Sequence, residues 1–292
     1  MKAIADSELI INPDGSVFHL HIKPGQLAGK VILVGDPGRV QTVAGFFDEV
    51  YHKGDNREFV WCTGIYKGEL FTVLSTGIGT DNIDIVLNEL DALVNVDFVT
   101  RLPKEEHKSL EIVRIGTSGS LQADIHSDSW VLSEKALGFD GLLNFYSGRD
   151  GISDLGFEQA FVSHSGWKAN LTKPYVVKAD SKLVGKLKSD KVYPGATISA
   201  PGFYGPQGRI IRLGLAMPDI NERITAFRYG EQRICNYEME CSAIYGLSAL
   251  LGHKAATVCV IIANRLAGTY SKDYKKQVTL LIEYVLDRLS AK

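Results

Sequence analysis

The sequence has only four cysteines in 292 residues, and no two of them form a Cys-x-x-Cys pair. This spacing argues against zinc ribbons and thioredoxin-like redox motifs. The sequence also shows no signal-peptide pattern, so we expect reduced thiols and a cytoplasmic protein. The longest uncharged and mostly apolar stretch, residues 241–252, has twelve residues. A membrane-spanning helix needs about 20, so we expect no membrane partner.

The sequence also has no large excess of positive or negative charge. Lys and Arg number 32, Asp and Glu number 34, and the formal net charge is -2, which argues against a dedicated nucleic-acid-binding protein. No Gly-x-Gly-x-x-Gly stands in a strand-to-helix setting, no Gly-Lys-Ser or Gly-Lys-Thr occurs, and no His-Glu-x-x-His is present. Dinucleotide sites, P-loops and zincin-type metal sites are therefore not indicated. We expect no resident metal.

What the sequence does contain is a series of short apolar runs that end in glycine-containing turns. Such runs are typical of strands buried on both faces. Helical periodicity follows at 81–94, 242–251 and 278–289. Strands alternating with helices predict a single α/β domain over residues 1–292, with a central mixed sheet flanked by helices. We assign no elements over 137–194 and interpret 101–108 as a surface excursion within the domain. The strand predictions are 31–34 before GDPGRV, 70–74 before STGIGT, 111–115 before GTSGSL and 256–263 before NRLAG.

Three glycine turns come with arginines nearby. Arg39 follows GDPG directly, Arg114 ends the strand before GTSG, and Arg57 lies in a separate NREF segment. Ligands bind beyond the carboxyl ends of strands in open α/β sheets, and guanidinium groups fit phosphate oxygens as a fork. These features together suggest a phosphate site. The alternative is that each turn merely ends a strand and each arginine is a surface charge.

Two further segments carry candidate binding groups. In NYEMEC, Glu238 and Glu240 would lie on one side of an extended segment, as two carboxylates that accept bonds from a vicinal diol. The alternative is an exposed acidic pair at the start of a helix. In the loop GFYGPQGR, Phe203 offers a stacking face while Gln207 and Arg209 offer hydrogen-bonding groups for a nucleobase. The alternative is an ordinary loop with one anchoring aromatic residue.

Taken in order, these segments resemble the nucleoside phosphorylase-I family, and within it the uridine phosphorylases. Each motif is weak alone, but seven occur in the family's order and, with the later IIANR segment, they span roughly residues 17–265. The resemblance implies a single α/β domain assembled as dimers or as hexamers of three dimers. The motifs are VFHL (17–20), GDPGRV (35–40), NREF (56–59), STGIG (75–79), RIGTSG (114–119), GFYGPQGR (202–209) and NYEMEC (236–241).

The resemblance also implies a role for individual residues. Arg57 and His19 match residues that reach the phosphate and the ribose of the neighbouring subunit, so a homodimer is the smallest complete unit. The catalytic set would be Arg39, Arg114, Glu240 and Arg209. The matched phosphate positions are Gly35, Arg39, Arg57, Arg114 and Thr117; the ribose positions are His19, Glu238, Met239 and Glu240; and the base positions are Phe203, Gln207, Arg209 and Arg265.

The expected activity is reversible phosphorolysis of uridine to uracil and ribose 1-phosphate, in pyrimidine salvage, with inorganic phosphate as co-substrate and no cofactor. Purine-cleaving relatives carry an aspartate near the end of the last strand, where this sequence has Asn264 followed by Arg265. Asn82 replaces a serine that some relatives associate with an intersubunit monovalent cation, although Glu58 matches another ligand position. The alternatives are a purine nucleoside phosphorylase, a related nucleosidase that uses water, and a non-catalytic nucleoside-binding protein.

Overall fold

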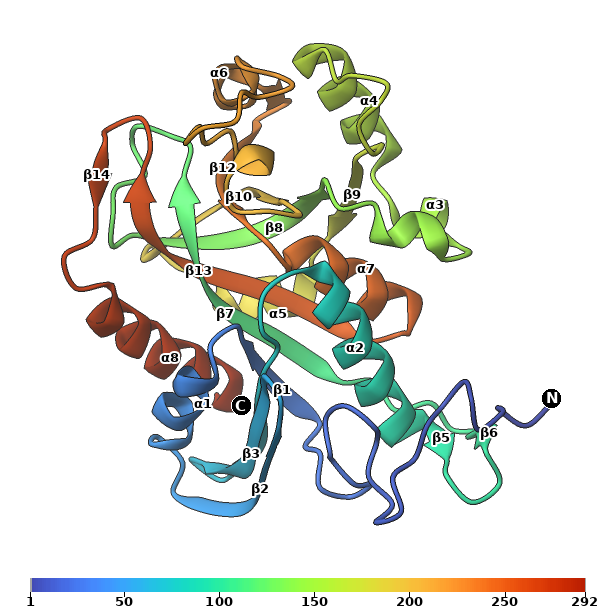
Figure 1. Cartoon of the computed structure of the whole chain (residues 1–292). Helices are drawn as coiled ribbons and strands as arrows, with labels where there is room; N and C mark the ends of the chain where they lie inside the picture. The colour runs from blue at the N-terminus through green and yellow to red at the C-terminus, as the bar shows by residue number, and fades with distance from the viewer. Residues whose placement is uncertain (1, 292) are drawn as a thin grey trace.

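The computed structural model describes residues 2–291, and Figure 1 shows a long twisted sheet with helices on both faces. The elements in chain order are β1 Lys30–Val34, α1 Pro37–Ala44, β2 Glu49–Asn56, β3 Phe59–Tyr66, β4 Glu69–Ser75, α2 Thr80–Asn95, β5 Val96–Asp97, β6 Leu102–Pro103, β7 Glu111–Ser120, β8 Trp130–Gly138, η1 Leu142–Phe145, α3 Arg149–Ile152, α4 Leu155–Ser165, β9 Tyr175–Lys178, α5 Ser181–Leu187, β10 Val192–Ser199, η2 Gly205–Gln207, α6 Ile220–Ala226, β11 Arg228–Tyr229, β12 Gln232–Glu238, α7 Cys241–Leu250, β13 Lys254–Asn264, β14 Thr269–Tyr270 and α8 Tyr274–Ser290.

The main sheet is mixed and follows the order β11-β12-β10-β8-β13-β7-β1-β4-β3-β2. The strands β1, β4 and β7 are parallel neighbours, whereas β2, β3 and β4 form an antiparallel meander. An additional antiparallel pairing joins β12 to β7, with Asn236 opposite Ser120 and Tyr237 opposite Gly119. The strands β7, β13, β8, β10 and β12 therefore form a closed ring of pairings, and this closure brings NYEMEC against β7.

Helices cover both faces of the sheet. The helix α8 presents one apolar stripe, whereas α7 is buried on all sides over residues 241–248. On one face, α2 and α7 pack together through buried residues such as Ile83, Leu87 and Ile244. On the other face, α1, α5 and α8 bury a second cluster that includes Val40, Leu183 and Leu281. A third cluster lies under α4 and α6, at the top of Figure 1.

Most of the expected elements are confirmed. The structure has helices at 80–95, 241–250 and 274–290 and strands at 30–34, 69–75 and 254–264, where periodicity and apolar runs predicted them. The stretch 137–194, to which no elements were assigned, holds three helices, one 3-10 turn and the complete strand β9, besides the end of β8 and the start of β10. All four cysteines are buried and unpaired. Within residues 2–291, no helix is both long and apolar enough to cross a membrane.

One expectation was wrong. GTSGSL is not a glycine turn after a short strand, because β7 continues from Glu111 through Ser120. The physical reason is the side chain of Arg114, whose guanidinium lies over Gly116 in the same strand. A Cβ at position 116 would overlap Nη1 of Arg114 and press on the Cys259 sulfur. Glycine in a strand interior often marks such a close approach rather than a turn.

Candidate active site

The centre of the site is a buried guanidinium between two buried carboxylates. Arg114 lies within β7, Glu238 ends β12, and Glu240 immediately precedes α7. Nη1 of Arg114 is 3.3 Å from Oε2 of Glu238, and Nη2 forms a closer ion pair with Oε2 of Glu240. Burial opposes the charge on Arg114, but the two carboxylates outweigh burial and raise the pKa of the guanidinium above its usual value. Because both glutamates are buried, the alternative of an exposed acidic pair is excluded.

Glu240 also joins two motifs that are far apart in the sequence. Its Oε1 accepts a hydrogen bond from the backbone N–H of Gly79 at 2.9 Å. Gly79 directly precedes α2 and has a φ of 101°, a conformation that glycine adopts readily and other residues rarely do. The STGIG turn and NYEMEC therefore hold one carboxylate from two sides. Met239, between the two glutamates, is partly exposed.

Beside this cluster lies a second cation. Arg39 is in the first turn of α1, and its Nη1 donates to the carbonyl of Ile115 on β7 at 3.2 Å. Burial lowers the pKa of Arg39, and the positive charge of Arg114 lowers it further. Two guanidinium groups that repel each other, one on α1 and one on β7, can share a bound anion. Gly35 and Thr117, the other two expected phosphate positions in this part of the fold, are partly buried.

The expected base-binding residues form a separate cluster around Gln207, which is 3% exposed. Its Oε1 accepts hydrogen bonds from Nη1 of Arg209 at 2.6 Å and from Nη2 of Arg265 at 2.9 Å. Arg209 also stacks on Phe203, with Cζ 3.8 Å from the ring centroid. Phe203 is 48% exposed. Arg265 lies over Tyr237, 4.9 Å from its centroid. The structure thus brings together all four expected base positions.

Asn264 next to this cluster is held as an amide. Its Nδ2 donates to the carbonyls of Gln122 at 3.0 Å and Ile125 at 2.8 Å, and its Oδ1 accepts from the N–H of Ala267. An aspartate in this orientation could not donate to either carbonyl. The residue therefore fastens the loop after β7 to the end of β13. It places no acid next to Arg265.

His19 and Arg57 lie apart from both clusters. Nδ1 of His19 is 2.6 Å from Oε1 of Glu89, and the Glu89 carboxylate also accepts the N–H of His19. Arg57 is exposed in the turn between β2 and β3, and its neighbour Asn56 donates to the carbonyl of His19 at 2.9 Å. Among residues 2–291, neither side chain contacts the Arg114 cluster of its own chain. Glu89 had no sequence signal, because it is 70 residues from His19.

The geometry around Asn82 bears on the cation expectation. Nδ2 of Asn82 donates to Oε1 of Glu58 at 3.1 Å and to the carbonyl of Thr76 at 2.9 Å. With the Asn82 amide nitrogen against both acceptors, these three groups do not present an oxygen-lined cation site within one subunit.

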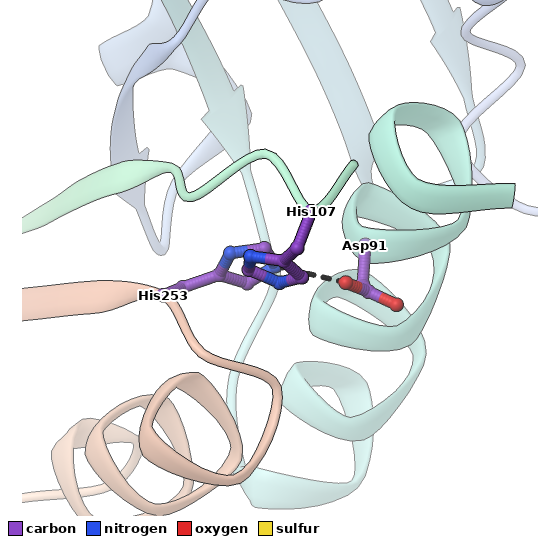
Figure 2. A group of neighbouring side chains, drawn as sticks. All are labelled: Asp91, His107 and His253. Carbon is purple, nitrogen blue, oxygen red and sulfur yellow. Dashed lines mark ion pairs between the residues drawn. The ribbon is translucent and has the colours of Figure 1, made fainter. Parts of the chain in front are cut away.

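One group in the described chain has metal-ligating side chains, and Figure 2 shows it: Asp91, His107 and His253. Nδ1 of His253 accepts the N–H of Leu110, so the neutral ring carries its proton on Nε2, which is 3.2 Å from Oδ1 of Asp91. Binding a metal through Nε2 would set two N–H donors against each other at Leu110. His107 stacks on His253, with 5.7 Å between the ring centroids, so the trio holds the 101–108 excursion against α2 and the turn before β13.

The chain is similar to several known nucleoside phosphorylases. A uridine phosphorylase of Thermococcus kodakarensis is 27% identical over 276 residues, which cover 92% of this chain and 84% of that protein. A DeoD-type purine nucleoside phosphorylase of a Geobacillus species is 28% identical, with 92% and 96% covered. The crystal structure of a Trypanosoma brucei nucleoside phosphorylase with uridine phosphorylase activity matches with a TM-score of 0.88 and 30% identity, covering 97% of this chain and all of that one. Residues 30–287 match the model of the phosphorylase superfamily, and the chain therefore belongs to that superfamily.

Proposed function

We propose that this phosphorylase cleaves uridine with inorganic phosphate, giving uracil and ribose 1-phosphate. The observation that carries the proposal is the pair of guanidinium groups on Gln207 Oε1. This arrangement offers fixed donors and positive charge to a pyrimidine-dione that leaves as an anion. It offers no carboxylic acid at position 264, such as would help to protonate a purine ring. The likeness to proteins with uridine phosphorylase activity supports the same substrate.

The proposed mechanism needs no covalent intermediate with the protein. Arg39 and Arg114, with Gly35 and Thr117, hold phosphate below the sugar, and an oxygen of phosphate attacks the anomeric carbon. The glycosidic bond breaks through a sugar cation, and its electron pair stays on the departing uracil. Positioning and electrostatic stabilisation then provide most of the rate acceleration.

The remaining groups orient the nucleoside. Glu240 accepts hydrogen bonds from the ribose hydroxyls and sets the ring pucker, with Met239 beside it. Gln207, Arg209 and Arg265 stabilise negative charge on uracil, and Phe203 packs on its ring. His19 and Arg57 act in the site of the neighbouring subunit, so a homodimer is the smallest active unit. Phosphate is the co-substrate, no resident cofactor is needed, and the role belongs to pyrimidine salvage in the cytoplasm.

Product analysis with and without phosphate tests this proposal. The purified protein should release uracil from uridine only when phosphate is present, and the sugar product should be ribose 1-phosphate. Release of free ribose without phosphate would identify a nucleosidase instead. Uridine binding by calorimetry with no product would identify a non-catalytic binding protein, and cleavage of inosine in place of uridine would identify a purine phosphorylase.

A further inference from the structure

The carboxylate of Glu238 has no free face. Its Oε1 accepts a hydrogen bond from the Ser199 hydroxyl at 2.5 Å and from the N–H of Cys241 at 3.0 Å. Its Oε2 accepts from the N–H groups of Glu240 and Cys241, both at 2.9 Å, and lies 3.3 Å from Nη1 of Arg114. The side chain is 1% exposed. A carboxylate has about four lone-pair sites, and these donors fill them.

The carboxylate of Glu240 has fewer hydrogen-bond partners than that of Glu238. Among the described residues, its carboxylate accepts hydrogen bonds from the N–H of Gly79 on Oε1 and from the guanidinium of Arg114 on Oε2. About two lone-pair sites therefore remain to accept hydroxyl hydrogens. Of the two glutamates in NYEMEC, only Glu240 has capacity left for a diol.

The groups that donate hydrogen bonds to Glu238 belong to the segment that positions Glu240. The N–H groups of Glu240 and Cys241 stand at the start of α7, where no intrahelical acceptor is available. Glu238 accepts both and so fixes the backbone from which the Glu240 side chain projects. Ser199, at the end of β10, braces this arrangement because its oxygen also accepts the N–H of Ser242 in α7 at 2.8 Å.

We infer that Glu238 is a positioning residue for the phosphate and ribose sites and does not bind ribose itself. It keeps one carboxylate on Arg114, and it holds the backbone of Glu240 in the position from which that side chain reaches the diol. This inference rests on the proposed function, because it assigns Arg114 to phosphate.

The test is the dissociation constant for inorganic phosphate, measured by calorimetry without nucleoside, for the wild type and for Glu238→Gln. A neutral amide at 238 leaves Arg114 with one carboxylate and sets an NH₂ group against backbone donors. We expect phosphate affinity to fall about tenfold or more, since small displacements of a site group are costly. In turnover, kcat should fall and KM for phosphate should rise. A ribose ligand would instead raise KM for uridine and leave phosphate affinity unchanged, which would overturn the inference.

Two other variants distinguish a specific effect on phosphate binding from a general loss of stability. Ser199→Ala removes one brace and leaves the Glu238 charge in place, so it should weaken phosphate binding in the same direction but less. Glu158→Gln removes a buried carboxylate paired with Arg149 at 2.8 Å, away from the site, and should leave phosphate affinity unchanged. If Glu158→Gln weakens phosphate binding as much as Glu238→Gln does, the effect is general destabilisation and the inference fails. If the wild type itself binds no phosphate, the proposed function fails first.

Discussion

Arg209 and Arg265 donate to the same oxygen, Oε1 of Gln207, at 2.6 and 2.9 Å. Burial lowers the pKa of both side chains, and burial together with the charge of Arg209 lowers the pKa of Arg265 to about 10. Among the described residues neither arginine forms an ion pair with a carboxylate. Like charges held together in this way make the site electropositive before any ligand enters, and a leaving uracil anion would relieve that repulsion.

This relationship predicts the effect of Arg265→Ala. Loss of one preorganised donor at a developing charge typically lowers kcat by about 10²- to 10³-fold. Steady-state kinetics should show that loss with uridine and little change in KM for phosphate. The loss should be smaller with 5-fluorouridine, because its base is a better leaving group and needs less stabilisation. An equal loss with both nucleosides would show that Arg265 acts on something other than the departing base.

A second prediction concerns Arg114→Ala. Arg114 is 5% exposed, so its removal takes a charge-assisted anchor from the proposed phosphate site and leaves Glu238 and Glu240 without their cation. Such losses cost about 2 to 5 kcal/mol. We expect the variant to fail mainly in its use of phosphate, seen as a large rise in KM for phosphate. Unchanged kinetics in phosphate would remove Arg114 from the phosphate site.

The third prediction is a pH dependence of stability that belongs to Glu238. Burial raises the pKa of this carboxyl to about 7 from the ordinary 4.5, although Arg114 partly offsets burial; Glu240 adds to the rise. A group whose pKa is raised on folding stabilises the fold fully below its unfolded pKa, and this contribution is lost as pH rises through its folded pKa. The free energy of unfolding should therefore fall between about pH 4.5 and pH 7 because of this residue.

Glu238→Gln cannot titrate and should lack that slope. Urea unfolding of both proteins across this range, at one protein concentration, gives the difference between them at each pH. The difference should change steadily with pH in the predicted direction. A difference that is constant from pH 4.5 to pH 7.5 would mean that the Glu238 carboxyl keeps one charge state throughout, and the raised pKa would be wrong.

Subunit mixing tests whether Arg57 and His19 act across an interface. A two-fold interface is reciprocal, so each subunit lends the same residues to the other. Arg57→Ala and Glu240→Ala should each be inactive alone. In a mixed dimer one site carries both lesions and the other carries neither, so activity should partly return once subunits exchange. If mass spectrometry confirms exchange and no activity returns, Arg57 acts within its own chain or not at all.

The sequence predicted the helices 80–95 and 274–290 well because their apolar stripes are local and regular. It misassigned 116–120 because glycine was interpreted as a turn signal, whereas Gly116 makes room for the Arg114 side chain. The convergence of NYEMEC on Arg114 depends on the pairing of β12 with β7, and pairings between strands so far apart leave no local pattern.

Motif matching gave the same role to Glu238 and Glu240, because both carboxylates fall in one short segment. Only the hydrogen-bond partners distinguish the two side chains. Backbone N–H groups and a hydroxyl fill the acceptor sites of Glu238, whereas Glu240 has two partners and can accept further hydrogen bonds. The His19–Glu89 pair likewise joins residues 70 positions apart, and no spacing rule connects them.

The most direct test of the central claim is the ratio of kcat/KM for uridine to that for inosine, both measured at saturating phosphate. A site whose buried polar groups are left unpaired by the wrong base can discriminate by about 10⁴-fold or more. Gln207 with its two arginines, and Asn264 held as an amide, lead us to expect uridine ahead by that order. Equal values for the two nucleosides, or a preference for inosine, would contradict the assignment of the base while leaving the phosphorylase family intact.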